Sequence, residues 1–174
     1  LFDIESSSTR SFTDLRKSAG NNEITAYCAD DKKNLWIGTG GGGLFMKSPS
    51  GIVRLFYRTG DSSEDYILNV HVDNERIWLG TLNGVIILDV NTGNLRGRYN
   101  TNNGLPHNRI DQICVLSDGT ASIATQTDRI YIIDAVKGVT SGNAIMRGPT
   151  MNVISSCCQS SDGNIWAATA GNGV

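Results

Sequence analysis

Short apolar runs separated by small clusters of polar residues dominate the chain. The runs at 35–39, 85–89 and 130–134 are rich in β-branched residues, and Gly, Asn, Asp or Ser bound them. This pattern is typical of strands joined by tight turns. The run at 52–58 instead alternates apolar and polar positions, as expected of an outer strand with one face in water. No stretch has the apolar periodicity of an amphipathic helix, so the pattern predicts an all-β fold.

One five-residue motif repeats along the chain. An apolar residue, Trp, a second apolar residue, Gly and Thr occur at 35–39 and 77–81, with altered copies at 121–125 and 165–169. A repeat of 42 to 44 residues that carries about four short strands is typical of a β-propeller blade. The residues that define the repeat are Trp36, Gly38, Thr39, Trp78, Gly80, Thr81, Thr125, Trp166 and Thr169.

An Asn/Asp-x-Ile motif marks the first strand of each unit, with the isoleucines at Ile24, Ile67, Ile110 and Ile154. The expected organisation is a single propeller segment, 1–174, whose parts are half a blade at 1–23, blades at 24–66, 67–109 and 110–153, and half a blade at 154–174. In the first half blade, 1–5 and 10–15 resemble a third and a fourth strand.

Two arrangements of these blades stay open. The two half blades could pair and close a four-bladed ring, or the chain could be an arc of a larger propeller. We favour the arc, because four blades is the lower end of the usual range. An open arc exposes apolar faces and is therefore expected to self-associate.

Composition and charge exclude several classes of partner. Charged residues make up 18% of the chain and the formal net charge is -2, without a Lys/Arg cluster. We therefore expect no nucleic-acid partner and no direct membrane contact. The longest apolar run, 85–88, is far too short to span a bilayer. Because the chain begins with Leu1, we expect it to be an excerpt of a longer protein.

The glycine run at 38–43 fits a Gly-x-Gly-x-x-Gly pattern, but a strand follows it rather than the helix that a dinucleotide site requires. We expect a turn with positive-φ positions and no cofactor. The tryptophans are expected to pack between sheets rather than to stack on sugars. The repeated threonines are expected to tie adjacent strands through their hydroxyl groups.

Four potential zinc ligands stand four positions after the isoleucines, at Cys28, His71, Cys114 and Cys158. Equivalent atoms of neighbouring blades lie about 10 Å apart, whereas zinc holds its ligands at about 2.0–2.3 Å. We therefore expect no metal site and interpret the cysteines as small buried hydrophobic residues. Only two histidines are present, His71 and His107, and no Gly-x-Ser-x-Gly motif occurs, so we expect no catalytic residues.

The phrases at 34–39, 76–81, 104–110 and 162–166 resemble the two-component-regulator propeller repeat. Ser122 replaces the tryptophan of the third copy, and the first two blades lack the Asp-Gly turn. The resemblance implies a periplasmic, non-catalytic sensor for glycan-derived oligosaccharides. It also implies a parent hybrid receptor with a membrane helix, a histidine kinase and a response regulator.

The ligand-binding residues are open at this point. The candidates are Arg54, Tyr57, Arg58 and Tyr66, which lie around the junction of the first two blades and could meet an acidic sugar. Two alternative functions remain. One is a streptogramin lyase-like propeller enzyme, which uses a metal and a histidine base on one face. The other is a structural scaffold for protein interactions.

Overall fold

The computed structural model describes residues 2–3, 8–9, 17, 22–73, 75–126, 129–140 and 154–169. Near the N-terminus the two short strands β1 (Phe2–Asp3) and β2 (Ser8–Thr9) pair in antiparallel fashion. Strand β1 lies within the stretch 1–5 that was expected to form a third strand. The fourth strand expected at 10–15 lies outside the described residues.

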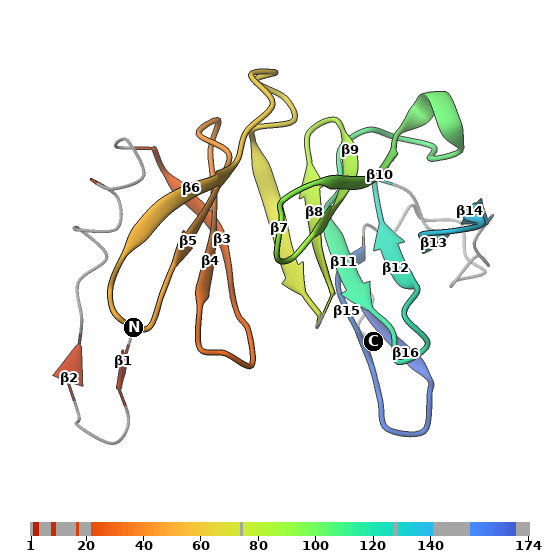
Figure 1. Cartoon of the computed structure of the whole chain (residues 1–174). Coiled ribbons are helices and arrows are strands. Elements are labelled where there is room, and N and C mark those ends of the chain that lie inside the picture. Colours follow the sequence, from red (N-terminus) through yellow and green to blue (C-terminus); the bar gives the residue numbers. More distant parts are fainter. Residues whose placement is uncertain are drawn as a thin grey trace.

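Three four-stranded antiparallel sheets follow in chain order, and we call them blades one to three (Figure 1). Blade one holds β3 (Ile24–Ala29), β4 (Leu35–Thr39), β5 (Leu44–Lys47) and β6 (Val53–Tyr57). Blade two holds β7 (Ile67–Val72), β8 (Arg76–Thr81), β9 (Gly84–Asp89) and β10 (Leu95–Tyr99). Blade three holds β11 (Gln112–Val115), β12 (Ala121–Ala124), β13 (Ile130–Asp134) and β14 (Gly138–Thr140). Blade four consists of β15 (Ile154–Gln159) and β16 (Ile165–Thr169).

The first strand of each blade lies beside the first strand of the next, in the order β3, β7, β11, β15. The short 3-10 turn η1 (Thr101–Asn103) lies in the connection from blade two to blade three. Figure 1 shows the blades in a row that does not close on itself. The all-β propeller fold is confirmed, and the open row is consistent with an arc.

The core lies between successive blades. Side chains of β4 and β5 meet the opposite face of blade two, where Trp36 clusters with Ile77, Leu79, Ile86 and Leu88. Trp78 extends the same arrangement to blade three and is fully buried. Packing between sheets is therefore confirmed for both tryptophans. It is wrong for Trp166, which is 53% exposed because no described sheet covers that side of blade four.

The repeated glycine and the repeated isoleucine are partners in these interfaces. A Cβ atom added at Gly38 would lie 2.6 Å from Cγ2 of Ile67, the first isoleucine of the next blade. A Cβ atom at Gly80 would lie 2.9 Å from the same atom of Ile110. The glycine and the isoleucine therefore recur with the same period. The absence of a side chain at the glycine lets the isoleucine of the next blade approach closely.

The hydroxyl groups of Thr39 and Thr81 tie adjacent strands at the hairpin turns, as expected. The Thr39 hydroxyl donates to the Gly43 carbonyl at 2.7 Å and accepts from the Gly42 N–H at 3.0 Å. Thr81 donates in the same way to the carbonyl of Gly84, at 2.8 Å. Gly43 has a φ of 85°, which confirms the positive-φ turn.

Candidate functional site

The connections between blades gather at one end of the sheets. Pairing of Leu44 with Tyr57 places the start of loop 58–66 beside turn 40–43. Pairing of Val85 with Tyr99 does the same for loop 100–109 in the next blade. Figure 1 shows both loops along its upper edge. We call loops 58–66 and 100–109 the loop face, because they differ in sequence while the strands around them repeat.

Asp65 organises the first of these loops. Its buried carboxylate accepts hydrogen bonds from the Thr59 N–H at 2.8 Å, the Thr59 hydroxyl at 3.0 Å and the Gly60 N–H at 3.0 Å. Arg58 completes the set with a contact of 3.3 Å from its Nε. Satisfying a buried carboxylate with four donors fixes the loop conformation, since an unpaired buried charge is costly.

Asn108 has the equivalent role in the second loop. Its side-chain oxygen accepts from the Thr101 N–H at 2.9 Å. Its backbone carbonyl accepts from the Gly84 N–H at 2.6 Å, just as the Asp65 carbonyl accepts from Gly43 at 3.1 Å. The Asn/Asp-x-Ile motif, expected only to open a strand, therefore also caps a loop and ties it to the previous blade.

Two further carboxylates of loop 58–66 are also engaged. Glu64 is 7% exposed and pairs with Arg98 of β10, with Oε2 and Nη2 3.0 Å apart. Hydrogen bonds from the side chain and backbone of Ser63 lower the pKa of Asp61. The loop is thus held to blade two at its base.

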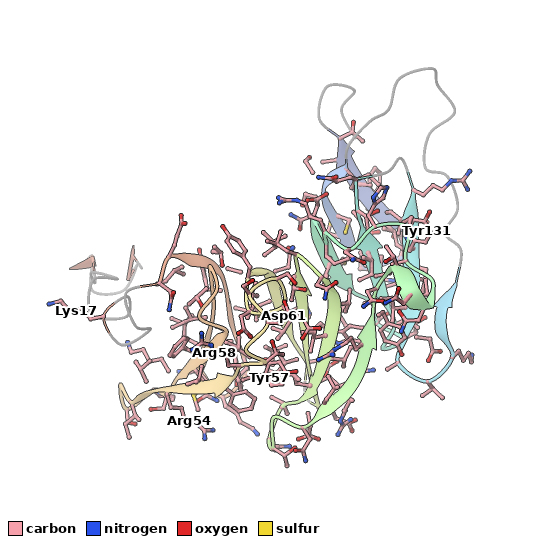
Figure 2. All side chains as sticks on the ribbon, turned by 90° about the horizontal axis from the view of Figure 1, so that it is seen from above. Lys17, Arg54, Tyr57, Arg58, Asp61 and Tyr131 are labelled. Carbon is pink, nitrogen blue, oxygen red and sulfur yellow. The ribbon has the colours of Figure 1, made fainter. Side chains whose placement is uncertain are left out.

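The four sequence-predicted candidates divide between two places, and three of them, Arg54, Tyr57 and Arg58, are labelled in Figure 2. Tyr57, Arg58 and Tyr66 border or lie in loop 58–66, and Tyr66 packs over Gly40, where a Cβ would come within 3.3 Å of its ring. Arg54 is exposed on the outer strand β6, and its guanidinium stands 5.4 Å from the Phe56 ring centroid. The guanidinium of Arg58 is already engaged in an ion pair with Asp65.

A small hollow of about 180 Å³ lies at the opposite end of the sheets, between the first hairpins of blades one and two. It is lined by Ala29, Asp30, Asp31, Lys32, Val72, Asp73 and Val90. Asp30 accepts a hydrogen bond from the indole N–H of Trp36 at 3.0 Å, and Asp73 accepts one from Trp78 at 3.3 Å. These carboxylates therefore hold hairpins to the core.

The hydrogen bond from the tryptophan to the hairpin carboxylate was not predicted, although the sequence contains an indication of it. Where Ser122 replaces the tryptophan, the first residue of the hairpin turn is Leu116 rather than an acceptor. Burial raises the pKa of Asp30, but hydrogen bonds from Asn34 and Trp36 outweigh it and leave that pKa below its ordinary value.

The cysteines are less buried than expected. Cys28, Cys114 and Cys157 are half-buried and Cys158 is exposed, so the prediction of small buried hydrophobic residues is wrong. Burial lowers the pKa of His71. This histidine lies on β7, directly opposite Trp78 of β8. Among the residues with described positions, no group of three or more His, Cys, Asp or Glu side chains could hold a metal ion. That part of the chain also holds no helix long and apolar enough to cross a membrane.

Successive four-stranded sheets, packed face to face along a row of first strands, define an arc of a β-propeller. Within this class, the family model for the two-component regulator propeller matches residues 18–41 and 148–171. These two segments, which contain Trp36 and Trp166, are thus similar to the two-component regulator repeat. No curated protein sequence matches the chain significantly.

Several solved structures share the fold. The extracellular domain of the hybrid two-component system BT3049 from B. thetaiotaomicron is 19% identical with a TM-score of 0.67; the match covers 86% of this chain and 21% of that one. A catalytically inactive variant of virginiamycin B lyase from Staphylococcus aureus, with quinupristin, is 14% identical (TM-score 0.69; 84% and 48% covered). The WD40 domain of Neurospora crassa Pan2 is 15% identical (TM-score 0.62; 89% and 46% covered). The chain therefore spans about a fifth of the first structure and about half of the other two.

Proposed function

We propose that this chain is part of the periplasmic sensor region of a hybrid two-component receptor and has no catalytic role itself. The observation that carries the proposal is the pair of two-component regulator repeats at 18–41 and 148–171. The fold shared with the extracellular domain of BT3049 supports it. In this proposal, ligand binding shifts the population of receptor states, and the chemistry of signalling takes place in another part of the receptor.

We place the ligand, a glycan-derived oligosaccharide, on the loop face. Tyr57 and Tyr66 supply aromatic surface beside loop 58–66, and aromatic rings with a polar edge suit one face of a sugar. Arg58 adds a donor that is 55% exposed although it pairs with Asp65. The hydrogen bonds of Asp65 and Asn108 fix the loop backbone, which lowers the entropic cost of binding.

Calorimetric titration of the complete extracytoplasmic region with a panel of glycan fragments tests this proposal. We expect one structural class of fragment to bind, and the variants Tyr57→Ala and Tyr66→Ala to weaken binding about tenfold, or about 1.4 kcal/mol. Leu55→Ala, a change at an exposed position on β6, is the matched control and should bind normally. If no fragment binds, or if the tyrosine variants bind as tightly as the unchanged protein, the proposed ligand and site are wrong.

A lyase-type enzyme is the second candidate, because the lyase structure has the same fold with a TM-score of 0.69. The same titrations, repeated with magnesium and with EDTA, separate the two functions. A sensor returns its ligand unchanged in either condition, as judged by mass spectrometry of the recovered fragment. Conversion of the ligand that requires magnesium and stops with EDTA would favour the enzyme.

A further inference from the structure

The interface between blades three and four differs from the two before it. Trp36 shares a core cluster with Val70 of blade two, and Trp78 shares one with Ile113 of blade three. At the third interface the corresponding residues are Ser122 and Cys157, whose Oγ and Sγ atoms are 3.7 Å apart. A hydroxyl and a thiol therefore occupy the place of an indole and an aliphatic side chain.

Strand register brings a second thiol to this place. Cys114 stands directly opposite Ser122, and opposed residues of neighbouring strands project from the same face of a sheet. Cys114 therefore points toward blade four, as Trp78 points toward blade three. On β15, Cys157 is opposite Ala167, which is buried against blade three, whereas Cys158 is opposite the exposed Trp166. Cys114 and Cys157 face each other, and Cys158 points away.

Ser122 connects the two facing cysteines across the interface. The Ser122 hydroxyl donates to the Cys114 carbonyl at 3.3 Å and also contacts Cys157. The Cys114 thiol, placed on the same face by its register opposite Ser122, donates to the carbonyl of Val115 at 3.9 Å. Burial, aided by the nearby Cys114, raises the pKa of Cys157 to about 11. Both cysteines are half-buried, so small reagents can reach them.

We propose that Cys114 and Cys157 form a disulfide bond that joins the first strands of blades three and four when the protein meets a small-molecule disulfide. The thiolate of Cys114 attacks oxidised glutathione, forms a mixed disulfide and releases one glutathione thiolate. Cys157 then loses its proton and attacks the Cys114 sulfur, which releases the second glutathione. Two protein thiols are oxidised, one glutathione disulfide is reduced, and both protons end on glutathione.

The full 174-residue chain, held in oxidised glutathione, tests this proposal. Free thiols are then alkylated, and the chain is digested without reductant for mass spectrometry. We expect one peptide pair that links Cys114 to Cys157, with Cys28 and Cys158 alkylated. Because Cys157 and Cys158 share a tryptic peptide, the variants Cys157→Ser and Cys158→Ser are compared directly.

The link should disappear in Cys157→Ser. It should persist in Cys158→Ser, the control variant, which replaces only the exposed neighbouring cysteine. Adding a reductant should lower the Tm of the unchanged chain and of Cys158→Ser, but not that of Cys157→Ser. Four free thiols after oxidation of the unchanged chain would overturn the proposal, whatever the variants do. So would a link that survives in Cys157→Ser and is lost in Cys158→Ser.

Discussion

Single residues set the distance between blades. At Gly38 the backbone has an ordinary φ, so the glycine is required by the nearby Ile67 and not by conformation. Blade three has Ala124 at the equivalent position, and Ala124 shares a core cluster with Ile154 of the next blade. The interfaces of the arc are therefore not identical, since a methyl group is accommodated at the third one.

Replacement of Gly38 by alanine should destabilise the chain by about 1–3 kcal/mol, because the new methyl group overpacks the interface. The measurement is urea unfolding, in which the midpoint should fall at an unchanged slope. Val136→Ala, at a position that is 93% exposed, is the control and should stay within about 0.5 kcal/mol of the unchanged chain. Equal stability of Gly38→Ala and the control would contradict the close contact with Ile67.

A second prediction concerns acid and Asp30. Because its pKa in the folded chain lies below the ordinary value of 3.8, its ionised form stabilises the fold above that value. This contribution is lost as the pH falls through the lowered folded pKa. The difference in free energy of unfolding between the unchanged chain and Asp30→Asn should thus be largest near neutral pH and shrink in acid.

Urea unfolding at several pH values measures this difference. Ser50→Ala changes no titratable group, so its offset from the unchanged chain should not vary with pH. An Asp30→Asn offset that is equally constant would mean that the hydrogen bonds from Asn34 and Trp36 do not favour the ionised carboxylate.

At the scale of elements, the sequence predicted the strands well because their signals are local. The repeat at 35–39 and 77–81 became β4 and β8, since apolar side chains on both faces of a strand are buried only between two sheets. The loop caps were not predicted, because Asp65 acts through the conformation of residues 58–60 before it in the chain. The exposure of Cys158 was not predicted either, since it depends on which faces of blade four are covered.

Trp78 and Trp166 should differ in their contribution to the free energy of unfolding. Trp78→Ala removes a fully buried side chain and should cost about 3–5 kcal/mol. Trp166→Ala should cost clearly less, because that side chain is 53% exposed in this chain. Chemical unfolding of both variants checks the order. Equal losses would show that another surface covers Trp166.

At the scale of the whole molecule, the exposed side of blade four has a consequence for assembly. Trp166 is 53% exposed there, and a large apolar group on an open sheet favours association. We predict that the isolated chain self-associates through this face as its concentration rises. Sedimentation velocity measures the effect, and Trp166→Ser should weaken it. Leu95→Ser, at a 50% exposed position on β10, should leave it unchanged. A monomer at all concentrations would contradict the prediction.

The loop face connects this arc with signalling in the proposed receptor. The strands repeat from blade to blade, so they can provide a rigid frame but little specificity. Loops 58–66 and 100–109 differ from each other and are held by Asp65 and Asn108 at corresponding positions. A ligand that contacts both loops would connect the junction of blades one and two with the junction of blades two and three.

Ligand-dependent phosphorylation of the complete receptor tests the central claim most directly. The full-length protein is reconstituted in lipid vesicles with radiolabelled ATP and with the oligosaccharide that calorimetry identifies. We predict that the ligand changes the rate of autophosphorylation, that Tyr66→Ala requires about tenfold more ligand, and that the oligosaccharide is recovered intact. A rate that does not respond to the bound ligand, or a full-length protein without kinase activity, would contradict the assignment of this chain to a sensor.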